Sequence, residues 1–515
     1  MSQAFGALQW RFDAACDRGL MQAAAVRRRF LRRVAFIGVT GSAGKTMAKE
    51  LIVAILAREL RGRGNNSNAN SPIDVAKMVW TTPFSSDFCV MEMSASRPGY
   101  LDKPLAISRP RIGVVTTVGD DHLSAFGSRE AIAQEKGKLI GALPSNGTAV
   151  LNADDALVAA MAPHCAGRVL TYGLSHLAEV RAEEISANWP RRLELTVTYR
   201  GEHVRVLTQL CGKHWTPSVL AAVATGVALG ISLQQCAEAI AATPPYLARM
   251  QPISTGDGIV FIRDDWKAPL WTIGPAFEFM REAQARRKII VIGTLSDYRG
   301  DASGQYLGVA RRALEIAEHV VFVGPWAHRS LRAADGRNDR SIRAFSHVRQ
   351  SSDYLISVFQ QGDLILLKGT NRRDHLFRII LARSREIRCW RDDCDKTMFC
   401  DRCELRLVPS GPPAADLDMA HTPQVDQPAV QEKQTSPAAA LEVIIGLGNP
   451  GADRVGSPHN IGHAVLDRLA ETLESSWFQH DNAMIGRAQW KDRNVCLVKL
   501  QTGVNKSGAA LRMLA

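Results

Sequence analysis

Short apolar runs alternate along this chain with stretches in which apolar residues recur every three or four positions. Residues 34–39, 88–93 and 111–117 are such runs, and a helix-period segment follows each of them. A second series of the same kind begins near Met250. Strands that alternate with helices in this way predict an α/β fold with largely parallel sheets.

Changes in the pattern divide the chain into segments. We expect a basic helical leader over 1–33, a parallel-sheet domain over 34–245, a smaller Rossmann-like domain over 246–388, a cysteine-rich segment over 389–405, a disordered linker over 406–440 and another α/β module over 441–515. The linker assignment rests on six of the 23 prolines and an almost complete lack of aliphatic pattern.

Composition narrows the class of protein. The chain has 515 residues, a net charge of +12 and ten cysteines, which is enough length for about three domains. The charge is compatible with an anionic partner, although a solvated basic surface explains it equally well. No signal-peptide pattern or membrane-spanning run is present in the sequence, and the cysteines suit a reducing compartment. We therefore expect a cytoplasmic protein.

The apolar run 34–39 leads into the glycine-rich stretch Gly41-Ser42-Ala-Gly44-Lys45-Thr46. Such a loop, between a buried strand and a helix, points backbone N–H groups at a polyphosphate, while Lys45 reaches the outer phosphates and the Thr46 hydroxyl can bind magnesium. A strict phosphate-loop pattern would place glycine where this chain has Val39. The alternative is a glycine-rich turn that binds no phosphate.

Three further residues draw attention: Glu92 lies at the end of the apolar run 88–93, His122 follows the run 111–117, and Lys136 lies in the next helical stretch. The carboxyl ends of parallel strands, beside a phosphate loop, are where an α/β sheet places its chemistry. With Leu151-Asn-Ala-Asp-Asp155, these motifs resemble the Mur ligases, in particular the type that adds D-alanyl-D-alanine. The resemblance covers about residues 34–385, with a central domain over 34–245 and a C-terminal domain over 246–388.

The resemblance implies an ATP-dependent amide ligase that works through an acyl phosphate. Thr46 and Glu92 would hold one magnesium ion and His122 a second. Lys136 matches the family's carbamylated lysine, whose CO2 adduct carries a negative charge. The alternatives are that Glu92 only caps a helix and that Lys136 is a solvated helix residue.

The motifs on the adenine side depart from those of the family. Ser218 and Lys267 stand where the family has asparagines, and Pro269 replaces another. Arg249, Asp264 and Lys368 do match family positions. The resemblance therefore implies ATP binding by Ser218, Arg249 and Asp264 with Lys368 near the substrate, and it leaves base selectivity open.

Only about 33 residues precede the phosphate loop, whereas the muramyl ligases begin with a larger UDP-sugar-binding domain. This layout, which is similar to that of folylpolyglutamate synthases, leads us to expect a carboxylate other than a UDP-muramyl peptide. The acid and the amine are not identified by the sequence.

Four cysteines, Cys389, Cys394, Cys400 and Cys403, lie close enough in sequence to surround one tetrahedral zinc ion. We expect a structural zinc knuckle. The alternative is a set of unrelated cysteines in a flexible tail.

Residues 443–515 resemble the amino-terminal part of bacterial peptidyl-tRNA hydrolase in the order of their motifs. The resemblance implies that His459 is the general base and that Asn449 and Asn505 hold the peptidyl main chain. Arg454 and Pro458 depart from the family, and the chain ends at Ala515, before the family's histidine-orienting aspartate. We therefore expect little hydrolysis, and a decayed module is the alternative.

Together these motifs predict an ATP-dependent acid–amino-acid ligase fused to a hydrolase-like module, with charged tRNA as a possible partner. The alternative is a nucleotide-binding regulatory or tRNA-binding protein with degenerate ligase and hydrolase sites, which Ser218 and Lys267 would fit.

Overall fold

The computed structural model describes residues 16–66, 69–298, 300–334, 341–392, 394, 396, 398–410, 442–446, 460–473, 475–480, 483–490 and 493–500. Residues 13–420 belong to one compact unit, and the described residues from Glu442 onward belong to another. Within the described residues, no helix combines the length and the apolar character needed to cross a lipid bilayer.

The first part of the larger unit is built on a nine-stranded sheet with the order β2-β3-β1-β4-β5-β6-β7-β8-β9. Its first seven strands in this order are parallel, and β8 and β9 are antiparallel additions at one edge. The strands are β1 (Ala35–Thr40), β2 (Gly62–Gly64), β3 (Phe88–Glu92), β4 (Ile112–Val115), β5 (Thr148–Asn152), β6 (Arg168–Gly173), β7 (Val180–Ser186), β8 (Glu194–Tyr199) and β9 (Glu202–Leu207).

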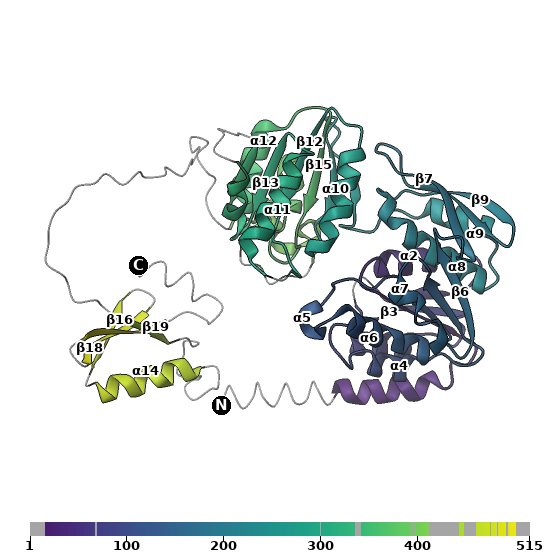
Figure 1. Ribbon diagram of the computed structural model, residues 1–515, viewed down its shortest axis with the longest axis horizontal. Helices are drawn as coiled ribbons and strands as arrows, with labels where there is room; N and C mark the ends of the chain where they lie inside the picture. The colour runs from purple at the N-terminus through teal and green to yellow at the C-terminus, as the bar shows by residue number, and fades with distance from the viewer. Residues whose placement is uncertain are drawn as a thin grey trace. The chain divides into compact units, whose positions relative to one another are not determined.

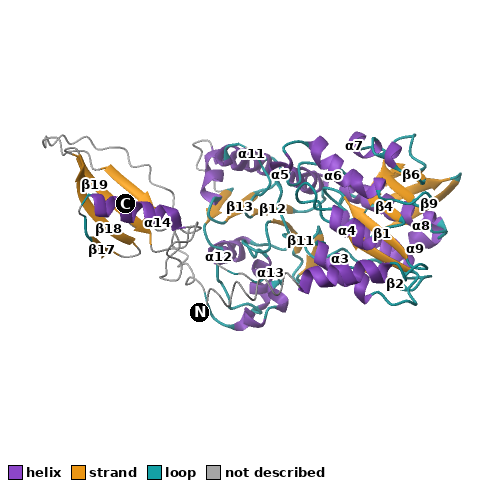
Figure 2. Ribbon diagram, turned by 90° about the horizontal axis from the view of Figure 1, so that it is seen from below, coloured by secondary structure: helices purple, strands orange, loops and turns teal. Residues whose placement is uncertain are grey.

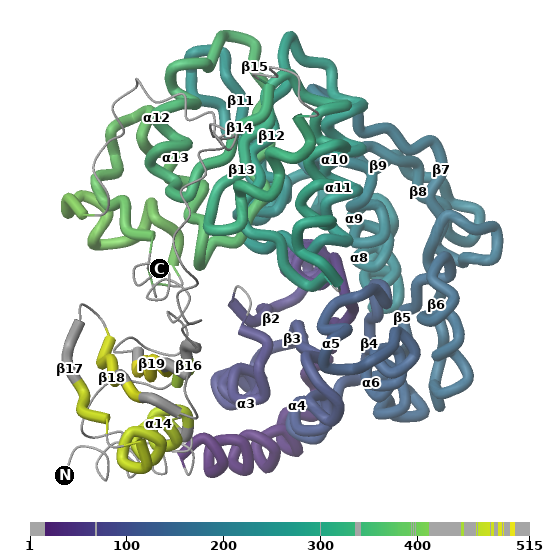
Figure 3. Tube along the Cα trace, turned by 60° about the vertical axis from the view of Figure 1, so that its left-hand side comes forward, coloured from purple at the N-terminus to yellow at the C-terminus, as the bar shows by residue number. Residues whose placement is uncertain are grey.

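Helices cover both faces of this sheet (Figure 2). Alternate residues of β1 enter different cores: Val39 packs with α2 and α8, whereas Phe36 packs with α3, α4 and α6. Helices α8 and α9 lie side by side and contact β6 and β9 (Figure 3). The helices are 16–28, α2 (Lys45–Leu56), α3 (Pro72–Thr81), α4 (Asp102–Ser108), α5 (Leu123–Phe126), α6 (Arg129–Gly141), α7 (Ala156–Ala159), α8 (Thr216–Ala228) and α9 (Leu233–Ala242).

The second part of the larger unit is a six-stranded sheet with the order β10-β11-β15-β12-β13-β14, parallel except for β10 (Figure 1). One face packs on α10 and α11 and the other on α12 and α13. The elements are β10 (Gln251–Ser254), β11 (Val260–Asp264), α10 (Ile273–Glu282), β12 (Arg287–Ile292), α11 (Ala302–Leu314), β13 (His319–Val323), β14 (Ile342–Phe345), α12 (Val348–Val358), β15 (Asp363–Lys368) and α13 (Phe377–Ser384).

The smaller unit contains a four-stranded sheet, β16-β19-β18-β17, with one helix. Helix α14 packs on β16 and β19, and Gly446 allows this approach, because a Cβ there would lie 2.5 Å from the Gly462 carbonyl oxygen. The elements are β16 (Glu442–Gly446), α14 (Ile461–Thr472), β17 (Trp477–His480), β18 (Ala483–Trp490) and β19 (Arg493–Leu500). The predicted α/β class with parallel sheets is confirmed.

Candidate active site

The glycine-rich loop joins β1 to α2 and needs both of its glycines. Gly41 has φ 147° and Gly44 has φ 75°, and a Cβ on Gly41 would lie 1.9 Å from Thr116 Oγ1. Lys45, the first residue of α2, donates to the Gly41 carbonyl oxygen at 2.6 Å. The loop therefore curls tightly at the N-terminus of a helix, the arrangement that suits a phosphate group.

Glu92 lies beside this loop because β3 pairs with β1, where Glu92 is opposite Val39. The Thr46 hydroxyl donates to Glu92 Oε2 at 2.8 Å, and Asn70 Nδ2 donates to Oε1 at 2.9 Å. Glu92 is only 2% exposed. A buried hydroxyl and carboxylate in contact supply the oxygen ligands that magnesium prefers, so these residues fit that ion.

His122 follows β4 in a left-handed conformation, with φ 57°. Its Nε2 lies 3.6 Å from Asp121 Oδ1, and Asp121 Oδ2 lies 3.7 Å from Lys45 Nζ. Burial opposes the ionisation of Asp121, but the charge of Lys45 and other nearby cations hold the pKa of this carboxyl below its usual range. Burial also lowers the pKa of His122. An ionised carboxylate and a neutral imidazole therefore face the phosphate loop.

Lys136 reaches the loop from α6. It is 1% exposed and its Nζ donates to the Gly41 carbonyl oxygen at 3.2 Å. Burial, together with the charge of Lys45, lowers the pKa of Lys136 to about 7. Lys136 is thus not a solvated helix residue, and its amine is partly uncharged near neutral pH.

The facing wall comes from the second sheet. Lys368, at the end of β15, forms a buried ion pair with Asp264, at the end of the neighbouring β11, and Nζ and Oδ2 are 2.6 Å apart. Ser218, on α8, lies behind the loop and its hydroxyl donates to the Gly44 carbonyl oxygen at 3.3 Å. Ser218 is therefore in contact with the loop backbone, whatever its role toward the base.

One cleft of about 670 Å³ joins these groups. Of the predicted site residues, it is lined by Ser42, Gly44, Lys45, Thr46, Glu92, His122, Ser218, Arg249, Asp264 and Lys368. Gly41 and Lys136 contact each other directly behind that lining. The structure therefore brings together the ligase residues predicted from the sequence, and their roles remain predictions.

Several cleft residues were missed by the sequence reasoning. Asn70, Asp121, Trp266, Trp271 and Asn371 all line the cleft. Asp121 had a visible signal, because it is the carboxylate directly before His122. Trp266 also had a signal, because it lies between Asp264 and Lys267 in the stretch that resembles a family motif.

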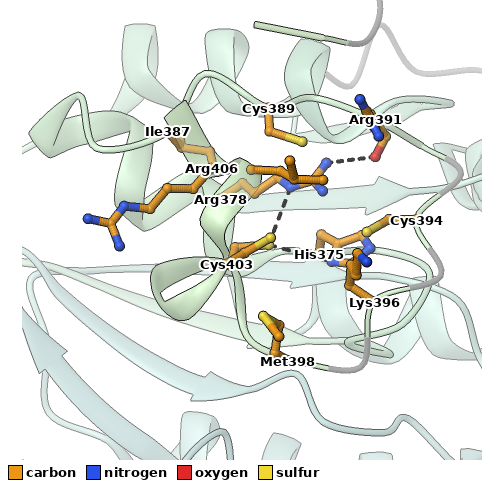
Figure 4. A pocket seen from close by; sticks show the side chains of 12 residues that line it. His375, Arg378, Ile387, Cys389, Arg391, Cys394, Lys396, Met398, Cys403 and Arg406 are labelled. Atoms are coloured by element: carbon orange, nitrogen blue, oxygen red, sulfur yellow. Dashed lines mark hydrogen bonds between the residues drawn. The ribbon is translucent and has the colours of Figure 1, made fainter. Parts of the chain in front are cut away.

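The four cysteines line a separate pocket of about 40 Å³ together with His375 and Arg378. Figure 4 shows Cys389, Cys394 and Cys403 around the Arg378 side chain. Cys400 Sγ accepts from Arg378 Nε at 3.4 Å and lies 3.6 Å from His375 Nδ1.

All four cysteines of this pocket are free thiols. Among the described residues, no three His, Cys, Asp or Glu side chains are arranged to hold a metal ion. The expected zinc site is therefore not supported by this arrangement, in which the Cys400 sulfur is directed at Arg378 and His375. The gathering of the four thiols at one pocket, by contrast, does not fit unrelated cysteines in a flexible tail.

The predicted hydrolase residues Asn449, His459 and Asn505 lie outside the described part of the chain. The described elements nearest to them in sequence are β16 for Asn449, α14 for His459 and β19 for Asn505. Their predicted roles stay predictions.

The fold and the cleft define a two-domain α/β enzyme that uses a nucleoside triphosphate. Residues 39–226 match the Mur ligase middle domain and residues 248–371 match the Mur ligase glutamate ligase domain. Residues 443–515 match peptidyl-tRNA hydrolase. The chain belongs to the Mur ligase family, and it is an ATP-dependent acid–amino-acid ligase that carries a peptidyl-tRNA hydrolase-like segment.

The family assignment rests on curated relatives. The chain is 30% identical over 358 residues to the UDP-N-acetylmuramoyl-tripeptide–D-alanyl-D-alanine ligase of Mycobacterium bovis, and the match covers 65% of this chain and 70% of that protein. The Bacillus subtilis protein of the same name is 27% identical over 343 residues, with 65% and 72% covered.

Solved structures share the fold. MurF from Acinetobacter baumannii gives a TM-score of 0.65 at 23% identity, covering 71% of this chain and 80% of that one. The MurF ligase of Thermotoga maritima, solved in complex with ADP, gives 0.59 at 20% identity, with 68% and 80% covered.

Proposed function

We propose that this enzyme uses ATP to convert a carboxylate to an acyl phosphate, which an amine then attacks to give an amide and free phosphate. The observation that carries the proposal is the contact of Thr46 with Glu92 beside Lys45, in the same cleft as the Asp264–Lys368 pair. Charge on the transferred phosphoryl group is stabilised by positioned cations, so Lys45 at the loop is in the right place to act.

Different residues of the cleft would perform different parts of this reaction. The loop glycines expose backbone N–H groups to the phosphates, while Thr46 and Glu92 would hold magnesium, which offsets phosphate charge when bound. Lys136, once carbamylated, would carry an anion in place of a buried amine. Asp264, Lys368 and Arg249 face the loop across the cleft and would hold nucleotide and substrate in line for transfer.

For the acid, we propose a carboxylate other than a UDP-muramyl peptide. The support is Lys267, which replaces an asparagine of the family motif and places a cation in the cleft, where it suits an anionic group. Turnover of UDP-N-acetylmuramoyl-tripeptide with D-alanyl-D-alanine, at a rate above that of every other pair tested, would contradict this proposal.

A second candidate function is a nucleotide-dependent regulatory protein without ligation. Ser218 and Lys267 favour it, because both replace asparagines of the family motifs. Screening pairs of carboxylates and amines for ADP release separates the two functions. A ligase requires both partners, whereas a regulatory ATPase requires neither.

For the cysteines, we propose a structural zinc ion that draws their sulfurs together. The support is that four thiols line one small pocket and that backbone bonds close the segment on itself: Cys389 N donates to the Arg406 carbonyl oxygen at 3.0 Å. Thiolates are the ligands that zinc prefers at structural sites. Elemental analysis of the full chain, purified without chelator, tests this, and absence of zinc would refute it.

For the smaller unit, we propose binding of charged tRNA. The support is the match of residues 443–515 to peptidyl-tRNA hydrolase, a range that contains the predicted site residues Asn449, His459 and Asn505. A module that grips an aminoacyl or peptidyl ester could present an amine to the ligase or cleave a tRNA-linked product.

A further inference from the structure

The cysteine segment packs against the strand that forms one wall of the ligase cleft. Phe399, directly before Cys400, lies edge to face with Trp266, with ring centroids 5.3 Å apart. Trp266 lines the cleft and follows β11. An aromatic pair of this geometry restricts both rings beyond the effect of simple burial. The position of Trp266 therefore depends on where the cysteine segment holds Phe399.

A buried ion pair makes a second connection to the same strand. The Arg263 guanidinium lies between the rings of Phe377 and Phe399, at 3.6 Å and 4.4 Å from their centroids. Arg263 Nε donates to Asp265 Oδ1 at 2.7 Å, and the two side chains are 2% and 0% exposed. Burying a charged pair costs free energy unless its neighbours hold both groups in place. Removal of the Phe399 ring should therefore disturb the Arg263–Asp265 pair.

A displacement of Arg263 also affects the cleft, because Asp264 is the next residue of the same strand. Side chains alternate along a strand, so Arg263 and Asp265 point away from the side that carries Asp264. Asp264 pairs with Lys368 at 2.6 Å in the cleft. A shift of Arg263 therefore moves the backbone that positions the Asp264 carboxylate.

The loop after β15 is held from the same side. Asn371 N donates to the Trp266 carbonyl oxygen at 3.3 Å, and Asn371 lines the cleft. A few residues on, His375 and Arg378 lie at the Cys400 sulfur, and Arg378 Nη1 donates to the Arg391 carbonyl oxygen at 2.7 Å. Both strands that supply the Asp264–Lys368 pair are thus tied to the cysteine segment.

We infer that the cysteine segment holds Trp266 and the Asp264–Lys368 pair in the geometry that binds magnesium-ATP, with Phe399 as the positioning residue. This inference rests on the proposed ATP site. The affinity for the nucleotide then depends on the cysteine segment, which does not contact the nucleotide itself.

The test compares binding of magnesium-ATP by calorimetry in the full chain and in three variants. Phe399→Ala should raise the dissociation constant about tenfold, the loss expected for an aromatic pair together with a cation–π contact. Phe399→Tyr keeps the ring and should restore binding. Tyr354→Ala is the matched control, because Tyr354 also combines an aromatic pair, with Phe345 at 5.5 Å, with a cation–π contact from Arg343, and these residues neither lie on β11 nor line the cleft.

Equal ATP affinity in Phe399→Ala and the wild type would overturn the inference, as would a loss of the same size in Tyr354→Ala. Failure of the wild type to bind ATP would instead refute the proposed ATP site, and the inference would fall with it.

Discussion

The Asp121 carboxylate lies 3.7 Å from the Lys45 ammonium, at the mouth of the phosphate loop. Asp121 is the anion directly before His122 in the sequence. Lys267 is an added cation, because it replaces an asparagine, and it lines the same cleft. The charge of Lys267 also contributes to the low pKa of Asp121. The charges of Asp121 and Lys267 therefore compensate each other in this cleft.

This compensation predicts non-additive effects on turnover. Asp121→Ala leaves the loop with excess positive charge, and Lys267→Asn leaves it with excess negative charge, so each should change ATP turnover severalfold. The double variant restores the balance and should be closer to the wild type than the product of the two single effects. Steady-state ADP release for the four proteins measures the coupling.

The control for this pair is Asp102→Ala with Lys103→Ala, which changes exposed charges of α4. Strict additivity of the Asp121 and Lys267 effects would contradict electrostatic compensation.

Lys136 should make turnover depend on CO2 and on pH. CO2 adds to the uncharged amine, and a pKa lowered to about 7 means that this form becomes dominant as the pH rises through 7. Turnover at fixed dissolved CO2 should therefore increase with pH across that point. The amine of an exposed lysine would require a pH near 10 for the same effect.

Depletion of bicarbonate should lower turnover of the wild type and leave Lys136→Ala at its own residual level. Short carboxylic acids added to Lys136→Ala should restore part of the activity, because they supply the missing anion. Full activity of the wild type in CO2-free buffer would argue against carbamylation.

If the four cysteines bind zinc as proposed, substitution of one of them should lower the zinc content of the protein. Cys400→Ser should reduce bound zinc from one ion per chain and lower the melting temperature, because structural zinc contributes folding energy. Cys16→Ser, at an exposed position, should change neither quantity. Elemental analysis and a thermal melt of the same samples provide both readings. Unchanged zinc content in Cys400→Ser would exclude Cys400 as a ligand.

The hydrolase-like segment predicts salt-sensitive binding of charged tRNA. Contacts to phosphates release counterions, so the affinity should fall steeply between low and physiological salt. Peptidyl-tRNA should bind more tightly than uncharged tRNA if Asn449 and Asn505 hold the peptidyl end. Filter binding at several salt concentrations distinguishes these cases, and no binding at low salt would refute the tRNA link.

The sequence was most informative where a local motif and the sheet topology agree. The glycine-rich loop, Glu92 and His122 could be placed together because parallel strands end at one edge of the sheet. The facing wall was harder to predict. Trp266 and Asn371 reach the cleft only because β11 pairs with β15, and nothing local to either residue indicates that pairing.

The arrangement of the cysteine segment shows a different limit. Spacing alone predicted that the four cysteines share a site, and they do share a pocket. It could not predict that His375, just before α13, and Arg378, in its first turn, would lie at the Cys400 sulfur. Such long-range neighbours decide whether a thiol cluster holds a metal in a given arrangement.

Formation of ADP in the presence of a carboxylate and an amine is the direct test of amide ligation in this cleft. We expect the wild type to release ADP and phosphate only when both partners are present, in a one-to-one ratio with amide product. Lys45→Ala should lower this rate by about a hundredfold or more, while Lys77→Ala on the exposed side of α3 leaves it unchanged. ADP release that ignores both partners, or that survives in Lys45→Ala at the wild-type rate, would contradict the assignment of this cleft as the site of amide ligation.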